Sequence, residues 1–199
     1  MKFSNNNYTM KKIGIDISID KWFDDVYQHV KHAISSKIGY CQEKSTLDPF
    51  NVFIGKMVEC CWYDRFILEE RFYCSKPDFT IYSNNSDGGV DFTILDTYVS
   101  VKCRSLEHNK SAYLDDQLIT FNKQYSQAEN IISKLINENK KCHFIVGAIR
   151  YKTLLYHDWI NAWKHEDINS LNQITKYIFN NEMIWFSTEY NKIQIEING

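Results

Sequence analysis

The stretch SDGGVDFTI at residues 86–94, followed by YVSVKCR at residues 98–104, decides the fold. A polar loop with two glycines ends at Asp91, and two short runs rich in apolar and β-branched residues follow it. These runs predict two strands, at 90–95 and 98–104, joined by a tight turn. We therefore expect a hairpin with an aspartate where its first strand begins.

The second of these strands carries a lysine in its middle. Because alternate residues of a strand share a face, Ser100, Lys102 and Arg104 point one way, while the intervening Val99 and Val101 suit a core. A lysine inside an otherwise apolar strand is uncommon. The pattern therefore indicates a polar face with a cation on it.

A helix predicted at 51–71 carries a second unusual charge. Glu59 is flanked at helical spacing by Gly55, Trp62 and Phe66, so its side of the helix is apolar or closely packed. An unpartnered carboxylate is costly in such a place. A metal ion beside Glu59 would remove that cost.

Each of these residues also has an ordinary structural explanation. Asp91 could cap the turn before its strand, as aspartate does beside glycines. Lys102 could lie on an edge strand, where lysine is common. Glu59 could form an ion pair with Lys56 or Arg65 of its own helix.

The remaining patterns predict an α/β protein with a mixed sheet. The run CHFIVGAIR, for example, is typical of a buried central strand. No linker-like stretch interrupts the 199 residues, so we expect a single domain. We expect further helices at 20–37, 116–137 and near 161–164, and further strands at 142–150, 154–160, 183–187 and 192–197.

Three short motifs follow one another along the chain. They are Gly-x-x-x-Glu on a helix, ending at Glu59, Gly-Gly-x-Asp at a strand start, ending at Asp91, and x-Val-Lys on the next strand, ending at Lys102. In this order, with these elements between them, they resemble the PD-(D/E)XK, or restriction endonuclease-like, nuclease superfamily. The resemblance covers about residues 51–160.

This resemblance implies both a fold and an activity. The fold is a restriction endonuclease-like core within residues 46–199, with a mixed central sheet flanked by helices, to which residues 1–45 add a helical extension. The activity is that of a Mg²⁺-dependent endodeoxyribonuclease of restriction or phage type, with Mn²⁺ as a substitute metal. Its substrate would be double-stranded DNA, and a homodimer would present two active sites to the two strands.

The resemblance also assigns roles to particular residues. Asp91 would be the principal ligand of the divalent cation, and Glu59 would complete the site from the helix. The backbone carbonyl of Val101 would be a further ligand. Lys102 would orient the attacking water and stabilise the charge that builds up on the phosphate.

The chain departs from the family pattern at Ser100. The family has an acid at this catalytic position, two residues before the lysine, so we expect weaker metal binding here. Another carboxylate could supply the acid, with Glu59 as the first candidate and Asp87 as the second. A literal Pro77-Asp78 also occurs, but it lacks the glycine loop, and we favour the aspartate of the hairpin.

Basic and polar residues near the expected site would contact DNA. We expect this role for Arg104, Lys56, Lys110, Lys123 and Gln124. Two other functions remain open. One is a catalytically inactive DNA-binding or accessory protein on the same fold, which the serine at the acid position favours. The other is a toxin nuclease that cleaves RNA.

The composition excludes several other classes of protein. Lys and Arg number 23 against 25 Asp and Glu, and the net charge of -2 excludes a strongly basic coat but not a local basic surface. No apolar run approaches the ~20 residues of a membrane span, and we expect a cytoplasmic protein. No phosphate-binding glycine loop or dinucleotide fingerprint occurs, so we expect no nucleotide cofactor.

Cysteine and histidine give weaker signals. The six cysteines form no CxxC pair, so we expect reduced thiols in the core instead of a zinc site. His29 and His32 lie one turn apart on the first expected helix, but no metalloprotease-type histidine pair is present. We expect these histidines to be packed or at the surface.

Overall fold

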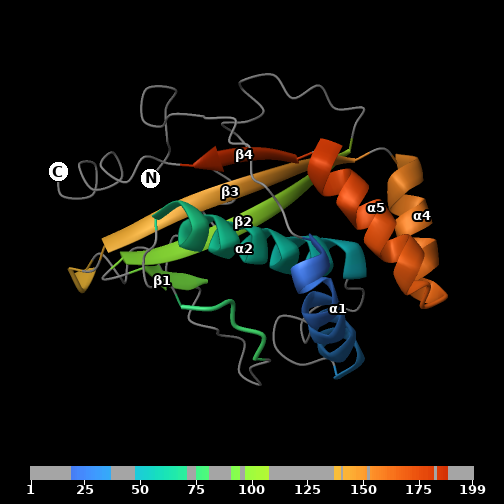
Figure 1. Cartoon of the computed structure of the whole chain (residues 1–199), viewed down its shortest axis with the longest axis horizontal. Helices are drawn as coiled ribbons and strands as arrows, with labels where there is room; N and C mark the ends of the chain where they lie inside the picture. Colours follow the sequence, from blue (N-terminus) through green and yellow to red (C-terminus); the bar gives the residue numbers. More distant parts are fainter. Residues whose placement is uncertain are drawn as a thin grey trace.

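The structure is a computed structural model in which four strands and four helices are described (Figure 1). It describes residues 19–36, 48–70, 75–80, 91–94, 97–107, 137–139, 141–151, 153–181 and 183–187.

A mixed sheet with the strand order β1-β2-β3-β4 runs through the described structure. β1 (Phe92–Ile94) pairs antiparallel with β2 (Thr97–Glu107), so the predicted hairpin is present. β2 runs parallel to β3 (Lys141–Tyr151) along its whole length. β3 pairs antiparallel with β4 (Met183–Ser187). β2 therefore lies between β1 and β3 at residues 97–99, and at Lys102 its described partner strand is β3.

Four helices pack against one face and one end of this sheet. α2 (Pro49–Glu70) lies across one face of it, and α1 (Ile19–Ser36) packs against α2 (Figure 1). α4 (Thr153–Lys164) and α5 (Ile168–Asn181) lie side by side near one end of the sheet. α2 therefore occupies the middle position, between the sheet and α1.

α2 is buried around most of its circumference. Its fully or almost fully buried side chains are Phe50, Phe53, Ile54, Met57, Val58, Cys60, Cys61, Trp62 and Tyr63. A helix with so many apolar side chains is stable only when most of its surface is covered by other elements. At 22 residues it is the longest described helix, and none of the described helices is both long and apolar enough to cross a membrane.

The start of α2 is fixed by its cap. Asp48 accepts a hydrogen bond from the backbone N–H of Phe50 at 3.0 Å and another from the Asn51 amide at 2.8 Å. Pro49 at the first helical position needs no such partner, because it has no N–H group. Tyr156 of α4 also donates to Asp48, at 3.2 Å. The cap thus fixes the helix start and its contact with α4.

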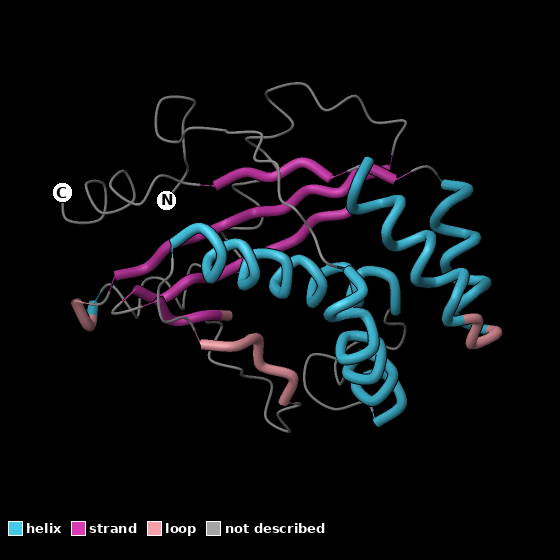
Figure 2. Tube along the Cα trace, in the orientation of Figure 1, coloured by secondary structure: helices cyan, strands magenta, loops and turns pink. Residues whose placement is uncertain are grey.

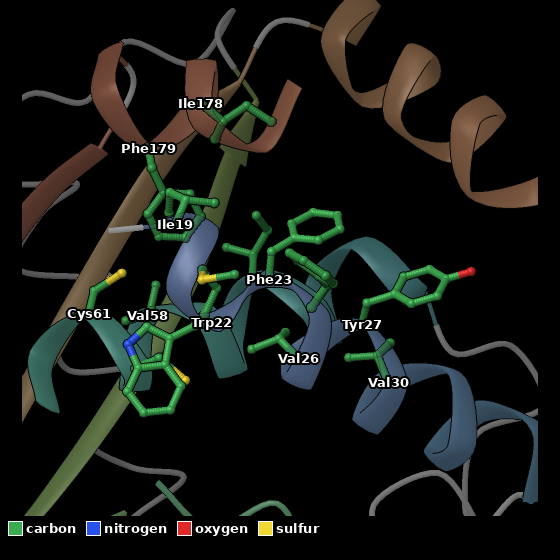
Figure 3. Close-up of a cluster of buried hydrophobic side chains, with 14 of the residues drawn as sticks. Ile19, Trp22, Phe23, Val26, Tyr27, Val30, Val58, Cys61, Ile178 and Phe179 are labelled. Atoms are coloured by element: carbon green, nitrogen blue, oxygen red, sulfur yellow. The ribbon is translucent and has the colours of Figure 1, made fainter. Parts of the chain in front are cut away.

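α1 confirms the helix that the sequence predicted at residues 20–37. Ile19, Trp22, Phe23 and Val26 are buried and face α2 and α5 (Figure 3). Core residues from α1, α2, β1, β2, α4 and α5 belong to one continuous hydrophobic cluster.

The strand predicted at residues 154–160 is wrong, because this segment is helical and forms most of α4. Trp159 and Ala162 are buried while Leu154 is exposed, which is the spacing of one helix face. The contact that fixes this face is tertiary: the Trp159 indole donates to the hydroxyl of Thr175 at 3.1 Å. Thr175 lies in α5, a helix that the sequence patterns did not predict.

One buried carboxylate links α1 to α2. Asp64 is 6 % exposed and accepts hydrogen bonds from Lys21 and, at 2.7 Å, from the indole N–H of Trp22. The Lys21 ammonium also lies over the Trp22 ring, 4.7 Å from its centre. A carboxylate at this depth is tolerated because both of its oxygens are paired.

We expect Asp64→Ala to lower the free energy of unfolding by about 2 kcal/mol, because the buried indole N–H of Trp22 then loses its acceptor. Urea unfolding followed by tryptophan fluorescence measures this. Lys31→Ala, which breaks the exposed ion pair with Glu166, is the control and should leave stability unchanged. Equal effects of the two substitutions would show that the Asp64 cluster is not a structural link.

Candidate functional site

Asp91 lies directly before β1 and is held by the neighbouring strand. Its carboxylate accepts a hydrogen bond from the backbone N–H of Val101 at 2.6 Å, and its own N–H donates to the carbonyl of Val99 at 3.0 Å. A hydrogen bond to a charged acceptor is stronger than a neutral one. The carboxylate is therefore fixed where β1 and β2 meet, and it makes a cross-strand contact in addition to any role in the preceding turn.

Glu59 is paired with a lysine of its own helix. Its Oε2 lies 2.5 Å from Nζ of Lys56, and both side chains are only 15 % exposed. Of the alternatives that the sequence left open, the structure has the ion pair with Lys56. The side chain of Arg65, the other candidate partner, lies outside the described residues. Glu59 thus has a cationic partner without a metal ion.

The segment 75–80 contacts both β1 and Lys56 (Figure 2). It runs beside β1, where the N–H of Ser75 donates to the carbonyl of Thr93 at 3.1 Å. Farther along, the carbonyl of Asp78 accepts a hydrogen bond from Lys56 at 3.0 Å, while its carboxylate accepts one from the N–H of Thr80. The sequence did not predict that this carbonyl would bind Lys56, because every residue has the same backbone carbonyl.

Electrostatics connect Asp91 to the Lys56–Glu59 pair. Burial by itself would lower the pKa of Lys56, but the charge and hydrogen bond of Glu59, together with the charge of Asp91, outweigh burial. The pKa of Lys56 therefore lies above its ordinary value of 10.5. Two carboxylates, from α2 and from the start of β1, act on one partly buried ammonium group.

β2 carries the other predicted positions. Ser100 is 2 % exposed, and no described group forms a hydrogen bond with its Oγ. Val101 is buried and faces the core, as its place in the alternation predicted. Lys102 and Arg104 belong to β2 by their backbones and pair in register with Val146 and Ala148, whereas their side chains lie outside the described residues.

Four further predicted residues lie outside the described part of the chain. They are Asp87, Lys110, Lys123 and Gln124. Of the predicted site, the structure thus brings together Asp91, Glu59 and Lys56 beside Val101.

The donor set has the chemistry of a Mg²⁺ site in part. Mg²⁺ prefers oxygen ligands and is commonly held by one or two carboxylates together with water and substrate phosphates. Asp91 and Glu59 supply two such carboxylates, and the buried Oγ of Ser100 is a polar atom that lacks a described partner. Within the described ranges, no three His, Cys, Asp or Glu side chains form a group that could hold a metal ion.

A cleft of about 480 Å³ adjoins this region, lined by Asp25, Gln28, His29, His32 and Phe79. His29 donates from Nδ1 to the carbonyl of Phe79 at 2.9 Å, which ties α1 to the segment 75–80. Burial lowers the pKa of His29, and nearby Lys56 lowers it further, against the opposing effects of this hydrogen bond and of Asp78. His29 is therefore a packed residue, as the sequence predicted.

The described cysteines Cys60, Cys61 and Cys103 are free thiols. Burial raises the pKa of Cys103 to about 12 and raises the values of Cys60 and Cys61 well above the ordinary range. A thiol acts as a nucleophile or soft metal ligand in its deprotonated form. These three residues are therefore core side chains, as predicted.

Comparison of the chain with protein-family models, with curated proteins and with solved structures finds no match.

We expect Lys56 and Glu59 to be strongly coupled in stability. Removing either partner leaves the other as an uncompensated, poorly solvated charge, whereas removing both does not. In a double-mutant cycle of Lys56→Met and Glu59→Gln, the interaction free energy should be about 1–3 kcal/mol. Urea unfolding of the four proteins measures it, and strictly additive single effects would contradict the pairing.

We expect the stability of the protein to fall as the pH drops below about 6.5, in part through His29. Because the pKa of His29 is lowered in the folded state from its ordinary 6.5, the unfolded chain binds more protons in this range and the free energy of unfolding decreases. Unfolding at pH 7 and pH 5 should show a smaller decrease for His29→Gln than for the wild type. His165→Gln, at an exposed turn, is the control and should retain the wild-type decrease.

Proposed function

We propose that the chain is a Mg²⁺-dependent nuclease of the restriction endonuclease-like class that hydrolyses phosphodiester bonds in DNA. The observation that carries the proposal is that Glu59 pairs with Lys56, whose ammonium also feels the charge of Asp91, while Asp91 is hydrogen-bonded to β2, the strand that bears Lys102. These two acids are 32 positions apart in the sequence, and each was assigned to the metal by its motif.

The connectivity of the sheet supports the same proposal. A helix bearing Glu59 precedes an antiparallel pair, β1 and β2, and β2 is then joined to the parallel strand β3. A parallel connection requires a crossover between the two strands. Among the described elements, α2 with Glu59, the start of β1 with Asp91 and β2 with Lys102 follow one another in the order of the three motifs.

Asp91 and Glu59 would hold the metal, with water completing the coordination. When bound, Mg²⁺ would supply an activated water molecule and neutralise charge on the phosphate. Lys102 would orient that water and stabilise the negative charge of the transition state. The Val101 amide, which donates to Asp91, would keep this carboxylate in place.

A second candidate is a DNA-binding protein on the same fold without catalytic activity. Two observations favour it: Ser100 brings no charge to the acid position, and Glu59 is already neutralised by Lys56. Both reduce the attraction of the site for a divalent cation. The two candidates differ in metal-dependent cleavage, so one experiment separates them.

We expect the purified chain to cut supercoiled plasmid DNA with Mg²⁺ or Mn²⁺ and not with EDTA. Lys102→Ala should lower the cleavage rate about 100-fold or more, because the transition state loses its fixed cation. Asp91→Asn should also lower it while keeping an oxygen that can accept the Val101 hydrogen bond. Gel electrophoresis of nicked and linear products measures these rates.

Lys31→Ala, far from the site in sequence and exposed, is the control variant and should cut at the wild-type rate. Structured RNA in a parallel assay tests the toxin nuclease alternative. DNA binding without cutting, with either metal, would reject the proposal in favour of the non-catalytic candidate.

A further inference from the structure

The place where a divalent cation would meet Glu59 holds an ammonium group of the chain itself. Nζ of Lys56 lies 2.5 Å from Oε2 of Glu59 and 3.0 Å from the carbonyl oxygen of Asp78. Each of these oxygens is of the kind that Mg²⁺ binds. The lysine thus uses the oxygen atoms that a metal would need.

This pair is not a loose surface contact. Both side chains are 15 % exposed, whereas the two partners of the Lys31–Glu166 pair are 45 % and 63 % exposed. The shielded pair is therefore less weakened by water and salt than the exposed one. Lys56 also approaches the ring of Phe79, 5.9 Å from its centre, which restricts where the ammonium can move.

We propose that Lys56 competes with the divalent cation for Glu59, so that metal binding requires the Lys56 ammonium to leave this carboxylate. The inference rests on the proposed function, since it takes Glu59 as a metal ligand. Two cations a few ångströms apart repel each other, and one Glu59 oxygen cannot serve both at full strength. The lysine would keep the metal-free protein stable and at the same time lower its affinity for the metal.

The displaced ammonium would remain near the site. It would then be available to a phosphate group of the bound nucleic acid, the role that the sequence predicted for Lys56. Metal bound at Glu59 and a phosphate of the substrate would both favour the position of the Lys56 side chain away from Glu59. Competition at Glu59 and phosphate binding are thus two states of one residue.

Isothermal titration calorimetry with Mn²⁺ tests the competition directly. Lys56→Met keeps the length of the side chain and removes its charge, and we expect it to bind Mn²⁺ about tenfold more tightly than the wild type. Lys31→Met removes the same charge from an exposed pair and should change the affinity less than about twofold. Circular dichroism confirms that each variant is folded.

The outcomes separate this inference from the proposed function. Tighter binding by Lys56→Met alone supports the competition. Equal or weaker binding by Lys56→Met, with measurable binding by the wild type, overturns the competition and leaves the metal site in place. No binding by either protein at millimolar Mn²⁺ overturns the metal site and the proposed function with it.

If Lys56→Met does not fold, a measurement on the wild type tests whether Lys56 leaves Glu59 when the metal binds. Mild acetylation of the native protein, read by mass spectrometry, compares the reactivity of individual lysines with and without Mn²⁺. We expect the modification of Lys56 to increase when Mn²⁺ is added, while that of Lys31 stays constant. An unchanged or reduced reactivity of Lys56 would overturn the inference.

Discussion

The burial of α2 between Phe53 and Asp64 is the constraint on which the rest of the structure depends. The helix lies between the sheet and α1, so any carboxylate on its central turns meets protein instead of water. An unpaired charge in such a place is costly, and each described carboxylate there has a cation beside it. Lys21 of α1 forms an ion pair with Asp64, and Lys56 of α2 itself forms one with Glu59.

These two pairs have different surroundings, and the difference separates a structural pair from a candidate site. Asp64 also receives the indole N–H of Trp22, so its pairing is complete and joins two helices. The lysine that pairs with Glu59 also feels the charge of a second carboxylate, Asp91, at the start of β1. Negative charge exceeds positive charge among these three groups, which is the condition under which an additional cation is attracted.

The sheet sets the position of that second carboxylate. Asp91 is tied to β2 through the Val101 amide, and β2 is in turn paired along its length with β3. The aspartate is thereby held next to the backbone of β2, one residue before the position of Lys102. This rigidity suits a site that must hold a charge before its ligand arrives.

The sequence alone determined the hairpin, the helix α1 and the burial of the described thiols, and it singled out Glu59 and Asp91. Alternation and helical spacing are local properties, so they can be read without knowing what lies opposite. Tertiary structure decided the rest. The segment at 154–160 became a helix because Trp159 packs and bonds against α5, and Glu59 was paired because α2 is enclosed. The Asp78 carbonyl joined the site through folding alone, since backbone groups are the same at every residue.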